Sequence, residues 1–193
     1  ESSVVAHLTS IALEMTAEWQ SSWVQSVSRP VPFSGVVNSD ESLLPPSLNA
    51  AQQRTLPQRP LSVAHVGPYL LQGGAERWLL DLVRHVDPDY LRFTRSICTN
   101  PTTIDASYAS ELSGAGVVLE AGDADSVRQA ASEVDVLLSW GVSLDEFLGD
   151  VRPPLSVQVV HGDGPYNRLL LSRSRRTVDH LVAVSHTVRS RIA

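Results

Sequence analysis

Cysteine is nearly absent from this sequence. Cys98 is the single cysteine among 193 residues, so a disulfide within the chain is excluded and a reducing compartment is favoured. It lies in the apolar run Ser-Ile-Cys, where a thiol usually behaves as a small buried side chain. We therefore do not expect a disulfide-stabilised secreted domain, nor a nucleophilic role for Cys98.

Long apolar runs are missing too. No stretch approaches the roughly 20 apolar residues of a membrane-spanning helix, and the first residues carry no cationic segment ahead of an apolar one, as a secretory signal would. We therefore expect a cytoplasmic protein, and a position at the inner membrane face stays open.

An excess of basic residues is also absent. Fifteen Lys and Arg residues stand against 21 Asp and Glu residues, which gives a net charge of -6. Nucleic-acid-binding domains normally have the opposite balance, so no nucleic-acid partner is expected. The six histidines are scattered without metal-site spacings, and neither a G-x-S-x-G elbow nor a P-loop occurs. We expect no metal ion and no covalently bound cofactor.

The residues that are present divide the chain into three regions. Apolar residues recur every three or four positions through 1–27, which predicts an amphipathic helix. We expect it to pack on the main domain or a preceding one, with a dimer or partner interface as the alternative. Prolines and serines gather in 28–60 and indicate a linker without regular structure. Short apolar runs alternate with helical patterns through 61–193.

This alternation predicts the fold of 61–193. Strands are expected over 62–67, 93–99, 117–119, 134–139, 156–160 and 180–184, and helices over 75–85, 107–113, 125–132, 144–148 and 166–177, with a last helix capped by Ser185. Strands that are apolar on both faces and alternate with helices indicate a parallel sheet covered on both sides. We therefore predict a Rossmann-like, doubly wound α/β domain. The sequence begins at Glu1 and stops about two turns into the last helix, so we expect a piece of a longer protein whose domain is truncated at its C-terminal end.

Bare backbone follows the first predicted strand. Gly73 and Gly74 stand where a strand passes into a helix, and glycine there can adopt unusual φ angles and expose its amides. A helix N-terminus favours phosphate or another anion. Glu76 and Arg77 follow in the first turn, where Glu76 can complement the helix dipole or touch a hydroxyl and Arg77 can reach an anion. A plain tight turn with a solvated helix start is the alternative.

Polar residues also end later strands. His161 closes the run Val-Gln-Val-Val and is followed by Gly162, so its ring can hydrogen-bond a sugar hydroxyl or phosphate, or a neighbouring carbonyl in a structural loop. Trp140 ends another buried strand, where it can stack on a sugar ring or cap the core. Further on, the basic segment with Arg168, Arg173, Arg175 and Arg176 suggests peripheral contact with an anionic membrane or an acidic acceptor, or a solvated helix face.

Taken together, these motifs resemble the N-terminal half of a GT-B glycosyltransferase of the large retaining family 4. The resemblance rests on SVAHVGPYLLQGGAERWLLDLVRHVDPDY, ELSGAGVVL, VDVLLSWG, VVHG and DHLVAVSHTVRSRI, in this order, between Leu61 and Ala193. It covers about two-thirds of the chain, and the helix and linker of 1–60 lie outside it.

The resemblance implies the acceptor-binding half of an enzyme that moves a sugar from a nucleotide-diphospho-sugar to a saccharide, lipid or other acceptor. Gly73 and Gly74 would lie beside the donor diphosphate and the acceptor, and His161 would contact the donor sugar. Glu76, Arg77, Trp140 and Ser185 would line the acceptor side. A C-terminal GT-B domain would hold the nucleotide sugar, so we expect these 193 residues alone to be inactive.

Two other readings stay open. A Rossmann-like binding or scaffolding module would use the glycine pair only as a turn. Half of a GT-B sugar-nucleotide epimerase would share this domain, since most of its distinguishing motifs would lie in the other half.

Overall fold

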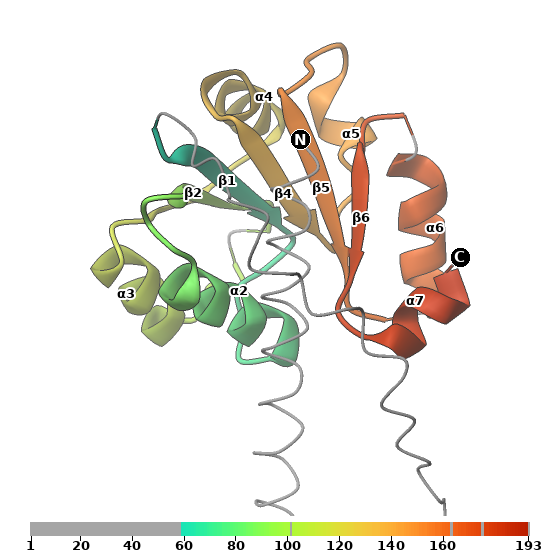
Figure 1. The fold of residues 1–193 in the computed structure, drawn as a ribbon, viewed down its shortest axis with the longest axis horizontal. Helices are drawn as coiled ribbons and strands as arrows, with labels where there is room; N and C mark the ends of the chain where they lie inside the picture. Colours follow the sequence, from blue (N-terminus) through green and yellow to red (C-terminus); the bar gives the residue numbers. More distant parts are fainter. Residues whose placement is uncertain (1–58, 101, 163, 175, 193) are drawn as a thin grey trace, which may run out of the picture.

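The computed structural model describes residues 59–193 except 101, 163, 175 and 193. The predicted helix over 1–27 and nearly all of the predicted linker over 28–60 lie outside the described residues. The described part is an α/β domain built on one six-stranded sheet, in which each neighbouring pair of strands is parallel (Figure 1).

The strands and helices alternate along the chain. The strands are β1 (Leu61–Gly67), β2 (Leu91–Cys98), β3 (Val118–Ala121), β4 (Val136–Trp140), β5 (Leu155–Val160) and β6 (His180–Ala183). The helices are α2 (Gly74–His85), α3 (Ala106–Gly114), α4 (Ala124–Glu133), α5 (Asp145–Leu148), α6 (Pro165–Ser174) and α7 (His186–Ile192). The spatial order of the strands is β3-β2-β1-β4-β5-β6. The chain begins at the central strand β1, adds β2 and β3 on one side of it, and then adds β4, β5 and β6 on the other side. The predicted Rossmann-like, doubly wound fold is confirmed.

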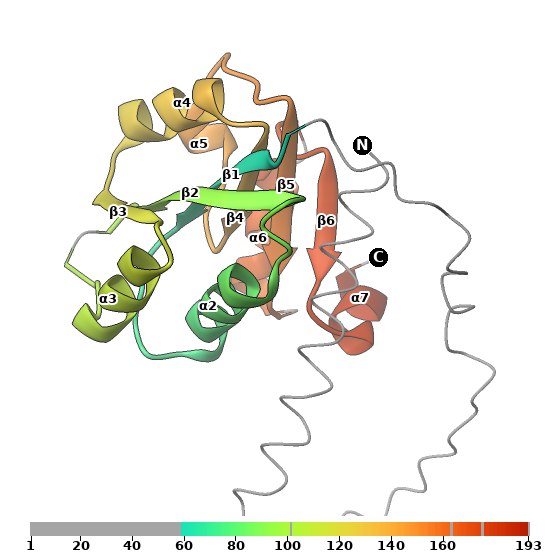
Figure 2. The ribbon, with the colours of Figure 1, turned by 60° about the vertical axis from the view of Figure 1, so that its left-hand side comes forward.

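Two apolar layers hold the helices on the sheet. On one face, α2 and α3 pack over Val63, Leu138 and Val157 of the central strands. On the other face, α4 and α5 pack over Ala64 and Leu137, and Figure 2 shows the two helix pairs on opposite sides of the sheet. This arrangement explains why the central strands are apolar at successive positions. None of the helices in the described part has the length and hydropathy needed to cross a membrane.

Short polar side chains begin several helices. The Asp105 carboxylate accepts hydrogen bonds from the amides of the first turn of α3, and Asp123 does the same for α4. At α7 the Val188 amide donates to the Ser185 hydroxyl at 3.2 Å, which confirms Ser185 as the predicted N-cap. The helix predicted to reach 177 ends at Ser174, because the amides of the next turn bond to the Ser174 carbonyl and lead the chain into β6.

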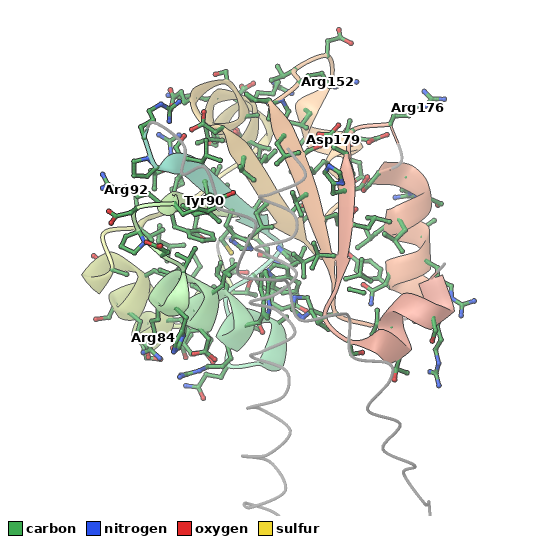
Figure 3. All side chains as sticks on the ribbon, viewed as in Figure 1. Arg84, Tyr90, Arg92, Arg152, Arg176 and Asp179 are labelled. Atoms are coloured by element: carbon green, nitrogen blue, oxygen red, sulfur yellow. The ribbon has the colours of Figure 1, made fainter. Side chains whose placement is uncertain are left out.

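Two Ser–Asp pairs join the N-terminal ends of neighbouring strands. The Asp135 carboxylate accepts from the Ser62 amide and hydroxyl, both at 2.8 Å, and Asp179 accepts from the Ser156 amide and hydroxyl, both at 2.7 Å. Arg59 adds two hydrogen bonds to Asp135 and holds the pKa of that carboxyl well below its usual value. In Figure 3, Asp179 lies at the start of β6. We call the side of the sheet at which the strands begin the N-terminal edge, and the side at which they end the C-terminal edge.

Candidate functional site

The candidate site lies at the opposite, C-terminal edge of the sheet. β1 and β4 are neighbours, but the helix after β1 packs on one face and the helix after β4 packs on the other. The connections after β1 and β4 therefore run to opposite faces of the sheet, and such a switch point is where ligands bind in open α/β sheets. His161 follows β5, the next strand along, so it reaches the same edge as the loop after β1.

Aromatic rings from four segments meet at this edge. The Trp140 ring lies edge-to-face with the Tyr69 ring, with centroids 5.3 Å apart, and edge-to-face with the His161 ring at 5.7 Å. His161 also lies edge-to-face with Trp78 of α2, with ring centroids 5.4 Å apart. These perpendicular arrangements are the favoured geometry of aromatic pairs. We call Tyr69, Trp78, Trp140 and His161 the ring cluster. Trp140 belongs to the apolar core, which is one of the two roles that the sequence predicts for it.

Several ring nitrogens near the cluster are buried without a hydrogen-bond partner. Among the described residues, Nε1 of Trp78 and of Trp140 and Nε2 of His65 and of His161 have none. Buried polar atoms are usually paired, so each exception calls for an explanation. Unpaired donors and acceptors at the C-terminal edge are what a site that hydrogen-bonds a polar ligand would contain.

His161 is held as a neutral imidazole. Burial lowers its pKa to about 4, because the surrounding rings cannot solvate a positive charge. At neutral pH its Nε2 can donate or accept one hydrogen bond to a ligand. A group with so low a pKa is a weak general base, so the environment suits orientation of a ligand better than proton abstraction.

His65 is a site residue that sequence reasoning missed. It lies inside β1, fully buried, and its Nδ1 is 2.9 Å from the Ser96 hydroxyl oxygen. Burial and the nearby His161 lower its pKa to about 3. A side chain on Gly67 would meet the His65 ring at 2.9 Å and Nε1 of Trp140 at 3.0 Å, so glycine allows both rings to approach the strand. The available signal was one polar residue in the apolar strand VAHVG.

The glycine loop is exposed, and neither glycine uses the unusual φ angles that glycine can adopt. Gly73 has φ -155° and ψ 172°, which is extended backbone, and Gly74 is not among the described glycines with positive φ. Glycine is needed at 73 for a different reason: a Cβ there would lie 2.5 Å from Oε2 of Glu76. Both glycines are exposed. They stand at the start of α2, and Trp78 of the same helix contacts His161.

Glu76 folds back over the start of its own helix. The residue is only 3% exposed. Burial raises the pKa of its carboxyl, and hydrogen bonds from its own amide and the Leu71 amide partly offset that rise. Glu76 is the third residue of α2 after the N-cap Gly73, the position from which a glutamate reaches back in a capping box. Its carboxyl group therefore lies in the first turn of α2, where a negative charge would complement the helix dipole.

Arg77 is engaged within its own helix. Its Nε lies 3.1 Å from an oxygen of Asp81, one turn further on. This pair neutralises the one cation in the first turn of α2, so the β1–α2 loop presents amides and a carboxyl group rather than a positive side chain.

The arginines predicted to form a patch are spread along α6 and beyond it. Arg168 lies near the start of the helix and is exposed, while Arg173 pairs with Glu146 at 2.8 Å. Arg176 lies past the end of α6, near the N-terminal edge of the sheet (Figure 3). Arg175 is not among the described residues.

Two further aromatic side chains at the site were also missed. Tyr69 follows β1 after a proline, and Tyr166 is the second residue of α6, where its hydroxyl donates to the Gly141 carbonyl at 3.1 Å. Turn residues precede both, Pro68 in one case and Gly164-Pro165 in the other. That position, just past a predicted strand, was the signal that could have found them.

In the part of the chain that the structure describes, no group of three His, Cys, Asp or Glu side chains is arranged to hold a metal ion. Neither a protein-family model nor a curated protein matches the chain. The chain is therefore assigned at the level of the fold, as a Rossmann-like α/β domain with a six-stranded parallel sheet.

Proposed function

We propose that this domain is the acceptor-binding half of a retaining GT-B glycosyltransferase, which transfers a sugar from a nucleotide-diphospho-sugar to an acceptor. One observation carries the proposal: α2, which begins at the glycine loop of the family 4 motifs, packs Trp78 against His161 of another of these motifs. The strand order adds support, because its reversal lies between β1 and β4.

The glycine loop would serve the donor phosphates. The exposed amides of Gly73 and Gly74 begin α2, and a helix N-terminus attracts anions through its unpaired amides and its dipole. Arg77, the arginine at the start of α2, pairs with Asp81. The phosphates would therefore meet backbone amides rather than this guanidinium group.

His161 would orient the sugar being transferred. Its neutral ring offers one hydrogen bond through Nε2, and two indoles fix the plane of the ring. A hydrogen bond of this kind fixes a sugar hydroxyl without moving a proton. In a retaining transfer, the donor phosphate itself would assist deprotonation of the acceptor. Because nucleotide sugars are made in the cytoplasm, we expect the reaction there.

The complete gene product is the protein to test. We expect it to release nucleoside diphosphate from a UDP-, GDP- or ADP-sugar only when a saccharide acceptor is supplied. His161→Ala should lower kcat by about 100-fold, the usual effect of losing one group that stabilises the transition state. His85→Ala, at the far end of α2, is the matched control and should change kcat less than twofold.

The same assay separates the alternatives. An epimerase would interconvert nucleotide sugars without an acceptor, and a scaffolding module would do neither. Full activity of the His161→Ala enzyme, with its circular dichroism unchanged, would remove His161 from the site.

A further inference from the structure

Exposed apolar side chains gather beside the ring cluster. Six large apolar side chains are exposed in the described part, and Tyr69, Leu71 and Tyr166 are three of them. The first two belong to the β1–α2 loop, and Tyr166 opens α6 after β5. Apolar side chains that remain exposed next to a crevice commonly mark a place where a ligand or a partner packs.

The two tyrosines and Glu76 are neighbours. Partial burial raises the pKa of Tyr69, and the nearby Glu76 carboxylate and Tyr166 phenol raise it further. Tyr69 is 38% exposed and Tyr166 is 60% exposed. Both rings are held in place, Tyr69 against Trp140 and Tyr166 through its hydrogen bond to Gly141. Two partly exposed aromatic rings therefore lie on the same side of the sheet as the end of β4, where one packs on Trp140 and the other bonds to Gly141.

The charges of the β1–α2 loop and of the first turn of α2 are acidic or neutralised. Arg77 pairs with Asp81. Asp105, which the Gln72 side chain of the β1–α2 loop contacts at 3.3 Å, keeps a pKa below its usual value because the Ser107 hydroxyl and amide donate to it. On the side of the β1–α2 loop, an anionic phospholipid would meet these carboxylates. A neutral ligand rich in hydroxyl groups would meet hydrogen-bond acceptors.

Resting on the proposed function, we propose that the acceptor is a neutral saccharide whose pyranose ring packs on Tyr69 and Tyr166 beside the β1–α2 loop. A pyranose has a flat face of C–H groups that suits an aromatic ring, and a rim of hydroxyls that suits a carboxylate. The Trp140 ring, on which Tyr69 packs, is buried, and its Nε1 has no hydrogen-bond partner among the described residues.

Saturation-transfer NMR on the 193-residue chain tests this inference. The probes are methyl α-glucopyranoside, methyl α-mannopyranoside and methyl β-galactopyranoside. We expect saturation of the ring C–H protons of at least one probe. Tyr69→Ala and Tyr166→Ala should each weaken binding about three- to tenfold, the range for loss of one aromatic contact.

Control variants separate stacking from folding. Tyr69→Phe keeps the ring and should bind as the native chain does, whereas Tyr69→Leu keeps the apolar bulk but should bind as Tyr69→Ala does. Val118→Ala removes an exposed apolar side chain from β3 and should change nothing. If no probe is saturated, if Tyr69→Ala binds normally, or if the chain instead sediments with phosphatidylglycerol vesicles, the inference is overturned.

The two proposals fail in different ways. Sugar transfer by the complete gene product without binding of any pyranoside to Tyr69 would remove the saccharide inference alone. Binding that depends on Tyr69, in a gene product that transfers no sugar, would remove the glycosyltransferase proposal and leave the saccharide site.

Discussion

Two imidazoles whose pKa values are lowered by burial should make the domain sensitive to acid. The pKa of His65 is about 3 and that of His161 is about 4, whereas an unfolded histidine titrates near pH 6.5. Both values are lowered on folding, so the unfolded chain binds more protons than the folded chain as the pH falls below 6.5. The stability that these residues contribute is complete above that pH and is lost progressively between about pH 6.5 and pH 4.

Replacing one imidazole should flatten this dependence. His65→Asn keeps a polar atom near Ser96 but cannot take up a proton in this range. Its free energy of unfolding, measured in urea between pH 6 and pH 4.5, should fall less steeply than that of the native chain by up to about 1.4 kcal/mol per pH unit, the value for one proton. Parallel pH profiles for the two proteins would show that His65 accepts a proton in the folded state.

At the scale of the residue, the sequence indicated where Gly73, Gly74 and His161 lie relative to the strands but not how they pack. Gly73, Gly74 and His161 were predicted because each stands just past an apolar run, and the end of a run is visible in the sequence. The packing of Glu76 over Gly73, rather than an unusual φ angle, was not visible. A rotamer depends on neighbours from distant segments, and neither composition nor periodicity contains that information.

Elements were predicted more closely, for a physical reason. Every central strand lies between two helix layers, so each shows a run of apolar residues that few other structures require. The disagreements lie at the ends. β4 was expected from 134 but begins at Val136, because Val134 caps α4 and Asp135 is bound to Ser62.

The Ser–Asp pairs connect neighbouring strands by hydrogen bonds, and substitutions can test how much these bonds stabilise the domain. Asp135→Asn loses the charge that the Ser62 amide and hydroxyl now contact, so it should lower the free energy of unfolding at pH 7 by about 1–2 kcal/mol. Asp179→Asn should act in the same direction through Ser156. Asp150→Asn, at an exposed position after α5, is the control and should change the urea midpoint little.

Acid provides a second check on the Asp135 pair. The folded pKa of Asp135 is lowered, chiefly by its hydrogen bonds to Arg59, so its contribution is present above the unfolded value of about 3.9 and is lost as the pH falls further. The stability difference between Asp135→Asn and the native chain should therefore shrink below pH 4. A difference that stays constant there would mean that the charge of Asp135 is not what stabilises β1 against β4.

In the whole molecule, the two edges of the sheet carry different kinds of side chain. The N-terminal edge has paired Ser and Asp groups, whereas the C-terminal edge has unpaired ring nitrogens and exposed tyrosines. The first set meets its hydrogen-bonding needs within the domain, and the second leaves them open. This division suits a domain in which one edge supplies stability and the other contacts a ligand.

The division predicts that changes at the two edges are independent. β1 has seven residues and so separates the edges by about 20 Å at roughly 3.3 Å per residue. Changes at that separation usually add to within about 0.5 kcal/mol. In urea unfolding, the loss for Asp135→Asn combined with Tyr69→Ala should therefore equal the sum of the two single losses. Tyr69→Ala combined with Trp140→Phe is the contrasting pair: these rings are 5.3 Å apart, so their effects should depart from additivity by more than that margin. Coupling above about 1 kcal/mol between Asp135 and Tyr69 would contradict the division, because the domain would then transmit changes along β1 from one edge to the other.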